Sequence, residues 1–379
     1  MKFGIEYYPT DRDIKEMILL DKDVFNMKDT ASFSKVKSWY KKNNEIYTVL
    51  KLDDVVVGYI NFMPITKPCY DKFIIGKYKD YMLTSKDITK FVKGDNYCLA
   101  MSIVVRKDLR DTKAIIKLWK GFLYKINKFK KQGIKIASIV ADCVSIDGVK
   151  FFISNYNGKY ICNSEDWGKI YEGNISNKYN RLPEIQLKPL NKYNIKTAAK
   201  FQYEIFKNSN SVGYCDYLDE IYNNGNITGG DWSQNYLIYY KNKPVGIIGL
   251  LKYDKYPEDI WLNWFGVMPK YRDKGIGTSS LIKIIKLARK YNVKNFRLFT
   301  YEMWYKVAQN IYRKTMQLEE VYLNSKDEQV INQQGSAKVY SISLVDKVCD
   351  KWDNKFLNLI SELDLSKRSI KKLKEDGFI

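Results

Sequence analysis

The segment from residue 260 to residue 290 most constrains the fold, because it reads as a strand, a glycine-bearing turn and a helix in succession. The apolar run Ile260–Val267 is typical of a strand, and Pro269 ends it. A helical pattern begins after Gly277, and its apolar face comprises Leu281, Ile284, Ile285 and Ala288. The first N–H groups of a helix have no internal partner, so this junction predicts an anion-binding site.

The turn between strand and helix has the composition expected of a phosphate site. The aligned peptide dipoles add about half a positive charge at the helix start. Gly275 and Gly277 would let a ligand approach the backbone without a Cβ in the way. Arg272 can add a charge-assisted hydrogen bond. The residues therefore favour a pyrophosphate, although an ordinary strand-to-helix turn is the alternative.

The full string is Val-x-Pro-x-Tyr-Arg-x-x-Gly-x-Gly, from Val267 to Gly277. It resembles the acyl-CoA signature of the GNAT superfamily of N-acyltransferases, Arg/Gln-x-x-Gly-x-Gly/Ala. A Rossmann fingerprint would need a third glycine and a later acidic residue, and a P-loop would need a lysine before Thr278. Neither pattern is present here.

The resemblance implies an α+β fold: a mixed, mainly antiparallel sheet flanked by helices, in which two central strands separate to admit acyl-CoA. The backbone of Phe265, Gly266 and Val267 would pair with the pantetheine arm, as an added strand does. The pyrophosphate would be held by Arg272, Asp273, Lys274, Gly275, Ile276, Gly277 and Thr278. The implied reaction is direct transfer of an acetyl or other short acyl group from acetyl-CoA to an amine, helped mainly by positioning of the two substrates.

A second resemblance lies downstream, in Tyr305–Lys314. It is similar to the family's helix beside the thioester, Asn-x-x-Ala-x-x-Leu-Tyr, with Tyr305 in place of Asn. The residues that match in register are Ala308, Ile311, Tyr312 and Lys314. A phenol can protonate a departing CoA thiolate, so Tyr312 is the predicted catalytic acid. The alternative is an ordinary tyrosine on an amphipathic helix.

The general base is less well defined. Attack on a thioester needs a neutral amine, so a base must remove a proton from the amine. Enzymes of this family often use for this a carboxylate on the strand before the glycine-bearing turn. Glu258 is the predicted base, with Asp259 and Glu302 as further candidates. Asn263 lies within the strand but cannot act as a base. Glu258 is equally consistent with an exposed turn residue.

The absence of histidine from the 379 residues limits the chemistry. It excludes Ser-His-Asp and Cys-His catalysis and any imidazole base or ligand. The six cysteines form no Cys-x-x-Cys pair, which favours a reducing cytosol, and no metal site is predicted. No apolar run reaches about 18 residues, so no membrane span is expected and a cytoplasmic location is predicted.

The net charge of +21 favours anionic ligands. The accompanying abundance of Lys, Asn, Ile and Tyr is what an AT-rich genome produces without functional pressure, so a nucleic-acid partner is not expected. The predicted partners are acetyl-CoA and an amine-bearing acceptor. Two other functions stay open: a non-catalytic acyl-CoA-binding or scaffold module, and aminoacyl-tRNA-dependent peptidyl transfer, which duplicated GNAT-like folds also perform and whose binding would fade steeply with salt.

Similar patterns occur in both halves of the chain, which indicates an internal duplication. In the first half, Arg110-Asp111 aligns with Arg272-Asp273, but Lys113 and Ile115 stand where the glycines would be. Phe replaces the phenol near residues 151–160. The predicted domains are a degenerate GNAT-like copy (1–175), an acyl-CoA-binding copy (184–346) and a C-terminal helical tail (347–379). The linker is predicted at 174–183, and residues 213–231 are interpreted as a loop that lines the acceptor pocket.

Overall fold

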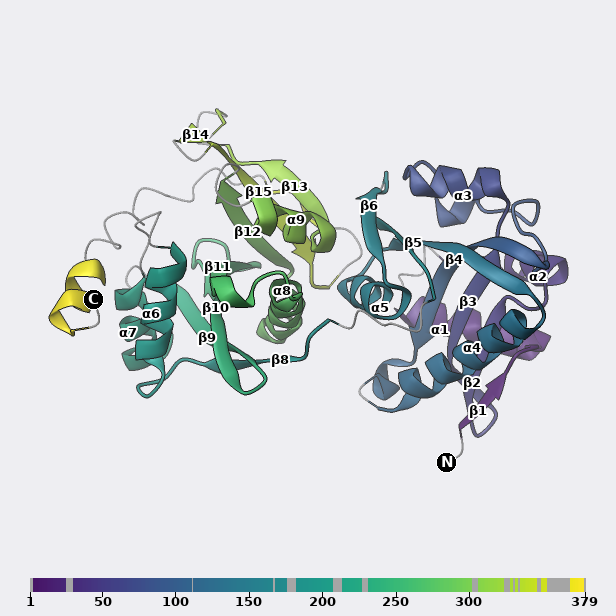
Figure 1. The fold of residues 1–379 in the computed structure, drawn as a ribbon, viewed down its shortest axis with the longest axis horizontal. Helices are drawn as coiled ribbons and strands as arrows, with labels where there is room; N and C mark the ends of the chain where they lie inside the picture. The colour runs from purple at the N-terminus through teal and green to yellow at the C-terminus, as the bar shows by residue number, and fades with distance from the viewer. Residues whose placement is uncertain are drawn as a thin grey trace. The chain divides into compact units, whose positions relative to one another are not determined.

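The computed structural model describes most of the chain and divides it into two compact units, Met1–Arg181 and Leu182–Ile379 (Figure 1). The described residues are 3–24, 30–110, 112–165, 168–175, 182–206, 213–226, 231–301, 306–323, 328–329, 331–332, 335–345, 349–352 and 369–377. The predicted linker falls at the boundary between the two units, and residues 176–181 of it lie outside the described residues.

The N-terminal unit is a seven-stranded mixed sheet, in the order β1-β2-β3-β4-β5-β7-β6. Its strands are β1 (Phe3–Glu6), β2 (Tyr47–Leu52), β3 (Val55–Pro64), β4 (Gly94–Val105), β5 (Ile134–Cys143), β6 (Lys159–Asn163) and β7 (Lys169–Gly173). Its helices are α1 (Asp11–Val24), α2 (Phe33–Lys42), α3 (Lys67–Ile74), α4 (Ala114–Lys131) and α5 (Ile146–Tyr156). Only β4 and β5 pair in parallel among the described strands of this sheet.

The C-terminal unit has an eight-stranded sheet, in the order β13-β15-β12-β11-β10-β9-β8, with β14 paired to β15. Its strands are β8 (Ile185–Pro189), β9 (Trp232–Tyr240), β10 (Lys243–Lys252), β11 (Asp259–Val267), β12 (Asn295–Tyr301), β13 (Leu318–Val321), β14 (Ile331–Asn332) and β15 (Gly335–Ser343). Its helices are α6 (Ile195–Phe206), α7 (Tyr214–Tyr222), α8 (Ile276–Ala288) and α9 (Lys306–Thr315).

The two units share one topology. Strand by strand, β1-β2-β3-β4-β5-β7-β6 corresponds to β8-β9-β10-β11-β12-β15-β13. The single parallel pair also falls at the same place, β4 with β5 and β11 with β12. The prediction of two tandem domains, each a mixed and mainly antiparallel sheet flanked by helices, is confirmed.

The helices of the C-terminal unit cover its sheet from two sides (Figure 1). Helices α6 and α7 pack on β9, β10 and β11, and their core includes Ala198, Tyr217, Leu237 and Ile247. Helix α8 buries Leu281, Ile284, Ile285 and Ala288, the apolar face that the sequence predicts. The interpretation of residues 213–231 as a loop is wrong for residues 214–222, which form α7: buried Tyr214 and Tyr217 lie three residues apart on its inner face.

The end of the chain packs on the same helix layer. Residues 369–375 are helical, and Leu373 is buried in the α6–α7 core. Ser369 accepts a hydrogen bond from the Cys215 amide (3.1 Å), and the Tyr214 hydroxyl donates to Asp376 (2.9 Å). The helical pattern expected at residues 352–363 lies almost entirely outside the described residues. Among the described helices, none combines the length and the apolar composition needed to cross a bilayer.

Candidate functional site

The two central strands of the C-terminal sheet separate, as expected. β11 and β12 pair in parallel at only three positions, and the last of them joins Trp261 to Arg297. β11 nevertheless continues to Val267 and β12 to Tyr301. From Leu262 onward, none of the described strands pairs with the edge of β11 that faces β12. This opening exposes main-chain groups that an extended ligand could pair with.

A β-bulge lies inside the opening. Ile247 of β10 faces Gly266, and Gly249 faces Asn263, so Trp264 and Phe265 together stand opposite one β10 residue. Trp264 has a φ of 38°, which costs a non-glycine residue roughly 1–2 kcal/mol. The bulge divides the side chains between the two faces of the sheet: Trp264 packs on the α6–α7 core, whereas the Phe265 ring approaches α9. No local sequence signal predicts it.

The turn after β11 has the geometry of an anion cradle. Pro269–Tyr271 form one 3₁₀ turn, and Gly275 caps α8 in the left-handed region, with a φ of 73°. Ser279 donates the first bond of the helix, to the Gly275 carbonyl (3.0 Å). The amides of Ile276, Gly277 and Thr278 therefore precede the first helical hydrogen bond. They are free to donate to a phosphate.

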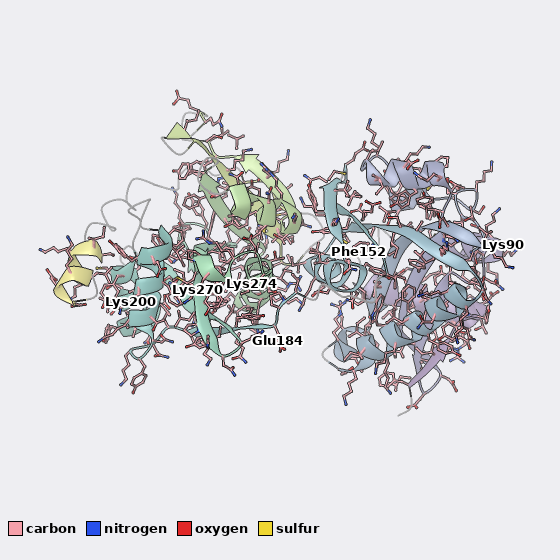
Figure 2. All side chains as sticks on the ribbon, in the orientation of Figure 1. Lys90, Phe152, Glu184, Lys200, Lys270 and Lys274 are labelled. Atoms are coloured by element: carbon pink, nitrogen blue, oxygen red, sulfur yellow. The ribbon has the colours of Figure 1, made fainter. Side chains whose placement is uncertain are left out.

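Three charged residues complete this turn. Arg272 is exposed, and its Nε donates to the Val267 carbonyl (3.0 Å), which fixes the end of the open strand. Lys274, which Figure 2 labels beside Lys270, donates from Nζ to the Lys270 carbonyl (3.1 Å). Asp273 has a φ of 60° and is exposed. The Arg272 guanidinium keeps further N–H donors for an anion.

The corresponding turn in the N-terminal unit keeps the arginine but not the glycine. Arg110 Nε donates to the Val105 carbonyl (3.3 Å), the same five-residue contact as in the other unit. The residue before α4 is Lys113, whose φ is −75° rather than positive. The strand end is therefore held in the same way, whereas the left-handed turn that opens the helix start is missing.

Tyr312 lies on α9 next to the opened strand. Its side chain is 6% exposed, and its ring centroid is 6.5 Å from that of Phe265 and 5.5 Å from that of Tyr340. The structure thus brings Tyr312 together with one of the three predicted pantetheine-binding residues. In the N-terminal unit, Phe152, which Figure 2 labels, lies on α5. Its ring centroid is 6.1 Å from that of Tyr171 on β7, a similar arrangement. The first copy accordingly has no phenol at this place.

Glu258 lies apart from these residues. It precedes β11 at the closed end of the parallel pair, and the length of the strand places it roughly 25 Å from Val267. Its side chain is 61% exposed and forms an ion pair with Lys294 (2.6 Å). Asp259 is bound to Arg297 (2.8 Å) and Asn295 (3.0 Å). Glu302 and Tyr305 lie outside the described residues.

A buried carboxylate on α7, Glu220, is not marked by any motif in the sequence. Glu220 is 7% exposed and accepts hydrogen bonds from Ser233 Oγ (3.2 Å), the Asn235 amide (2.8 Å) and Asn235 Nδ2 (2.6 Å). Burial raises the pKa of Glu220 to about 7, and Asp216 adds to the shift, whereas the donors from Asn235 and Ser233 oppose it. The only signal available was an acidic residue near the inner face of an amphipathic helix, in a segment interpreted as a loop.

This shift predicts that the unfolding free energy of the C-terminal unit falls as the pH rises. Between an ordinary pKa of 4.5 and about 7, the native state holds a proton that the unfolded state has lost. At about 1.4 kcal/mol per pKa unit, wild type should lose about 3 kcal/mol relative to Glu220→Gln between pH 4.5 and 8. Urea denaturation of both proteins across this range measures the difference. Parallel pH profiles would contradict the prediction.

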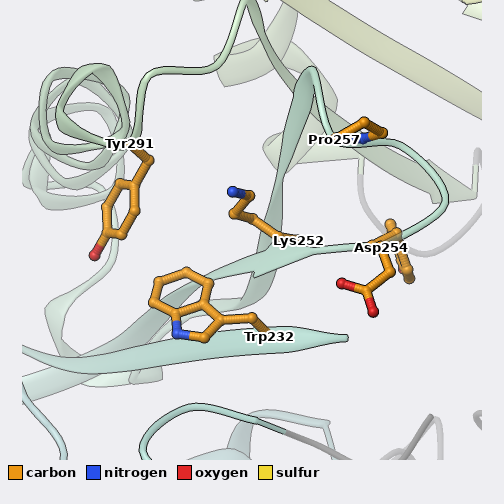
Figure 3. A pocket seen from close by; sticks show the side chains of 6 residues that line it. Trp232, Lys252, Asp254, Pro257 and Tyr291 are labelled. Atoms are coloured by element: carbon orange, nitrogen blue, oxygen red, sulfur yellow. The ribbon is translucent and has the colours of Figure 1, made fainter. Parts of the chain in front are cut away.

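A shallow pocket of about 400 Å³ lies elsewhere in the C-terminal unit (Figure 3). It is lined by Trp232, Lys252, Tyr253, Asp254, Pro257 and Tyr291. These residues come from the start of β9, the end of β10, the segment before β11 and the segment after α8, so none of the predicted site residues lines it. Within the described residues, no group of three or more acidic or cysteine side chains could hold a metal ion.

Comparison with known proteins supports the sequence resemblance. The family model described as Acetyltransferase (GNAT) family matches residues 199–316. No curated protein sequence matches the chain. A GNAT-family acetyltransferase structure from Staphylococcus aureus Mu50 shows 20% identity, covers 42% of this chain and 99% of its own, and gives a TM-score of 0.33.

Two other solved structures are similar to part of the chain. Spermidine N-acetyltransferase from Vibrio cholerae, in complex with CoA and spermine, has 13% identity, 43% and 97% coverage and a TM-score of 0.32. The ribosomal-protein-S18-alanine N-acetyltransferase from Escherichia coli has 12% identity, 46% and 100% coverage and a TM-score of 0.31. Similarities at this level do not assign an acceptor to this chain.

Proposed function

The C-terminal half of the chain contains an acetyltransferase domain of the GNAT family, and from that premise we propose that it transfers the acetyl group of acetyl-CoA to a primary amine. The observation that carries the proposal is the opening between β11 and β12, which ends directly at the unpaired helix start of α8. An extended arm and a diphosphate, the pantetheine and pyrophosphate parts of a CoA molecule, fit these two features in this order.

The described residues suit that substrate. The open edge of β11, at Phe265 and Gly266, would pair with the amides of the pantetheine arm. The amides from Ile276 to Thr278 would donate to the pyrophosphate, with Arg272 beside them. The Val267 carbonyl already accepts a hydrogen bond from Arg272. Val267 would therefore lie beside the pantetheine arm without accepting a hydrogen bond from it.

The reaction needs one bond formed and one broken. The amine lone pair attacks the thioester carbonyl carbon, a C–N bond forms, the C–S bond breaks, and the sulfur leaves as a thiolate that takes a proton. Tyr312, on the helix beside Phe265, would donate that proton. The amine must also lose a proton. Glu258 lies at the far end of β11, and this position does not support its predicted role as the base. We therefore propose that solvent takes the proton that the amine loses.

We also propose that only the C-terminal copy binds acetyl-CoA, and a matched pair of arginine variants tests this. Arg272→Ala should weaken acetyl-CoA binding by about 10-fold, because it removes one charge-assisted contact. Arg110→Ala removes the equivalent strand contact in the other unit and should leave the affinity unchanged. Isothermal titration of the full chain measures both. Equal losses would show that the two units bind alike or depend on each other.

The activity itself is tested by a thiol-release assay with acetyl-CoA and a panel of amines: spermidine, kanamycin, tyramine and a peptide with a free α-amine. Thiol release that depends on one of them, with an acetylated product seen by mass spectrometry, is the expected result. Binding of acetyl-CoA without any acetylated amine would favour a non-catalytic module. Salt-sensitive binding of aminoacyl-tRNA without acetyl-CoA binding would favour peptidyl transfer.

A further inference from the structure

A row of three polar or small residues crosses the C-terminal sheet next to the bulge. Asn235 on β9, Gly249 on β10 and Asn263 on β11 face one another in register. A Cβ at Gly249 would lie 1.9 Å from Asn235 Oδ1, so only glycine leaves room for the side chains on either side to meet over it. Asn263 Nδ2 donates across this gap to Asn235 Oδ1 (3.4 Å).

Glu220 sets the direction of this chain of hydrogen bonds. Above a pH of about 7, where Glu220 is ionised, its carboxylate can only accept, so Asn235 must present its NH₂ group to Glu220 and its oxygen to Asn263. Asn263 must then use its NH₂ group to reach Asn235, which leaves Oδ1 as the terminal acceptor. In the part of the chain that the structure describes, no donor pairs with this oxygen. A buried charge on α7 therefore fixes an acceptor on β11.

Asn263 stands where an acceptor substrate would meet the thioester. It lies two residues beyond Trp261, the last β11 residue that pairs with β12, and two residues before Phe265, about 7 Å along the strand. Its side chain is half-buried. Its link to Glu220 puts it on the α6–α7 face, opposite the face from which Tyr312 reaches Phe265.

The surroundings of Glu220 also favour a cationic partner. The ionisable groups that interact with it are Asp216, Tyr217 and Tyr236. None of these groups carries a positive charge, and no lysine or arginine among the described residues forms an ion pair with Glu220. When Glu220 is ionised, above a pH of about 7, no described group nearby neutralises its charge, and an ammonium group would be attracted to it.

We propose that Asn263 Oδ1 binds the amino group of the acceptor, and that Glu220, acting through Asn235, is the positioning residue that points this oxygen at it. The inference rests on the proposed acetyltransferase function and names the acceptor as a cationic amine that enters from the α6–α7 face. Glu220 itself does not touch the substrate, so it is not the catalytic base.

The test compares Asn263→Ala, Glu220→Gln and the double variant, with spermidine, kanamycin, tyramine and a free-α-amine peptide as acceptors. The amide introduced by Glu220→Gln offers a donor as well as an acceptor, so Asn235 and Asn263 lose their fixed orientation. Each single variant should raise the KM of the amine that wild type acetylates by about 10-fold, the effect of one hydrogen bond. The double variant should be no worse than either, because both changes remove the same contact. The acetyl-CoA Kd should stay within about 2-fold.

Glu204→Gln is the matched control, since it removes an exposed carboxylate from the neighbouring helix α6. It should change neither the KM of the amine nor the Kd of acetyl-CoA. If Glu220→Gln lowers the melting temperature too far for kinetic measurements, Asn235→Ala interrupts the same series of hydrogen bonds at its middle residue. This variant should reproduce the rise in the KM of the amine. An unchanged amine KM in variants that still bind acetyl-CoA would overturn the inference and leave the proposed function standing. Loss of acetyl-CoA binding in the wild-type protein would instead overturn the proposed function, and this inference with it.

Discussion

Gly275→Glu is expected to weaken acetyl-CoA binding at least about 100-fold, the largest effect of any single change in the cradle. Gly275 has a φ of 73°, and a side chain there would meet Pro183 at 3.1 Å. The added carboxylate would also place a negative charge at the helix start that is proposed to hold a pyrophosphate. Isothermal titration with acetyl-CoA measures the loss.

Backbone strain alone must be separated from this effect. Gly94, in the N-terminal unit, has a φ of 89° with open space around its Cβ position. Gly94→Glu introduces the same charge and a similar strain of roughly 1–2 kcal/mol, and it should leave the acetyl-CoA affinity unchanged. If Gly275→Glu still bound acetyl-CoA normally, the assignment of the α8 start as the pyrophosphate site would be wrong.

Tyr312→Phe is expected to lower kcat about 100-fold and to leave the acetyl-CoA Kd nearly unchanged. The substitution removes only the hydroxyl that would protonate the thiolate, and general acids typically contribute about 10²- to 10⁴-fold. The ring stays in its packing between Phe265 and Tyr340. Steady-state kinetics over a range of pH measure kcat, and isothermal titration measures the acetyl-CoA Kd. The limb of the pH profile of kcat that belongs to the acid should disappear.

Tyr340→Phe is the appropriate control for the loss of a phenol at this place. Tyr340 is fully buried, and its ring centroid is 5.5 Å from that of Tyr312. Its hydroxyl has no proposed contact with the substrate. Similar losses of kcat in both variants would mean that Tyr312 acts through packing and is not the acid.

The cradle and the strand order could be predicted because their signals are local. The apolar run, Pro269, the two glycines and the amphipathic helix lie within one continuous stretch, and each restricts the backbone directly. The same applies to Tyr312, which was found by its spacing from Ala308 along one helix. The duplication was detectable for a similar reason, since both halves repeat the same succession of strands and helices.

The acceptor side could not be predicted because it depends on register between strands. The contact between Asn235 and Asn263 exists only because Gly249 lies between them on a third strand. The left-handed φ of Trp264 has no sequence signature, as tryptophan rarely adopts it. Glu258 adjoins β11 in sequence, but a strand of nine residues keeps its first residue far from its last, so nearness in sequence does not place Glu258 near the turn after Val267.

The arginine contact common to the two units says something about how a repeated fold diverges. Arg110 and Arg272 anchor the last carbonyl of the strand to the turn, whether or not a glycine follows. This contact does not involve the glycines of the turn. One copy of a repeated domain can therefore lose ligand binding through a few substitutions in the turn and still keep its fold. Retention of an arginine in such a signature is therefore poor evidence that a pocket still works, whereas a left-handed residue after it is far better evidence.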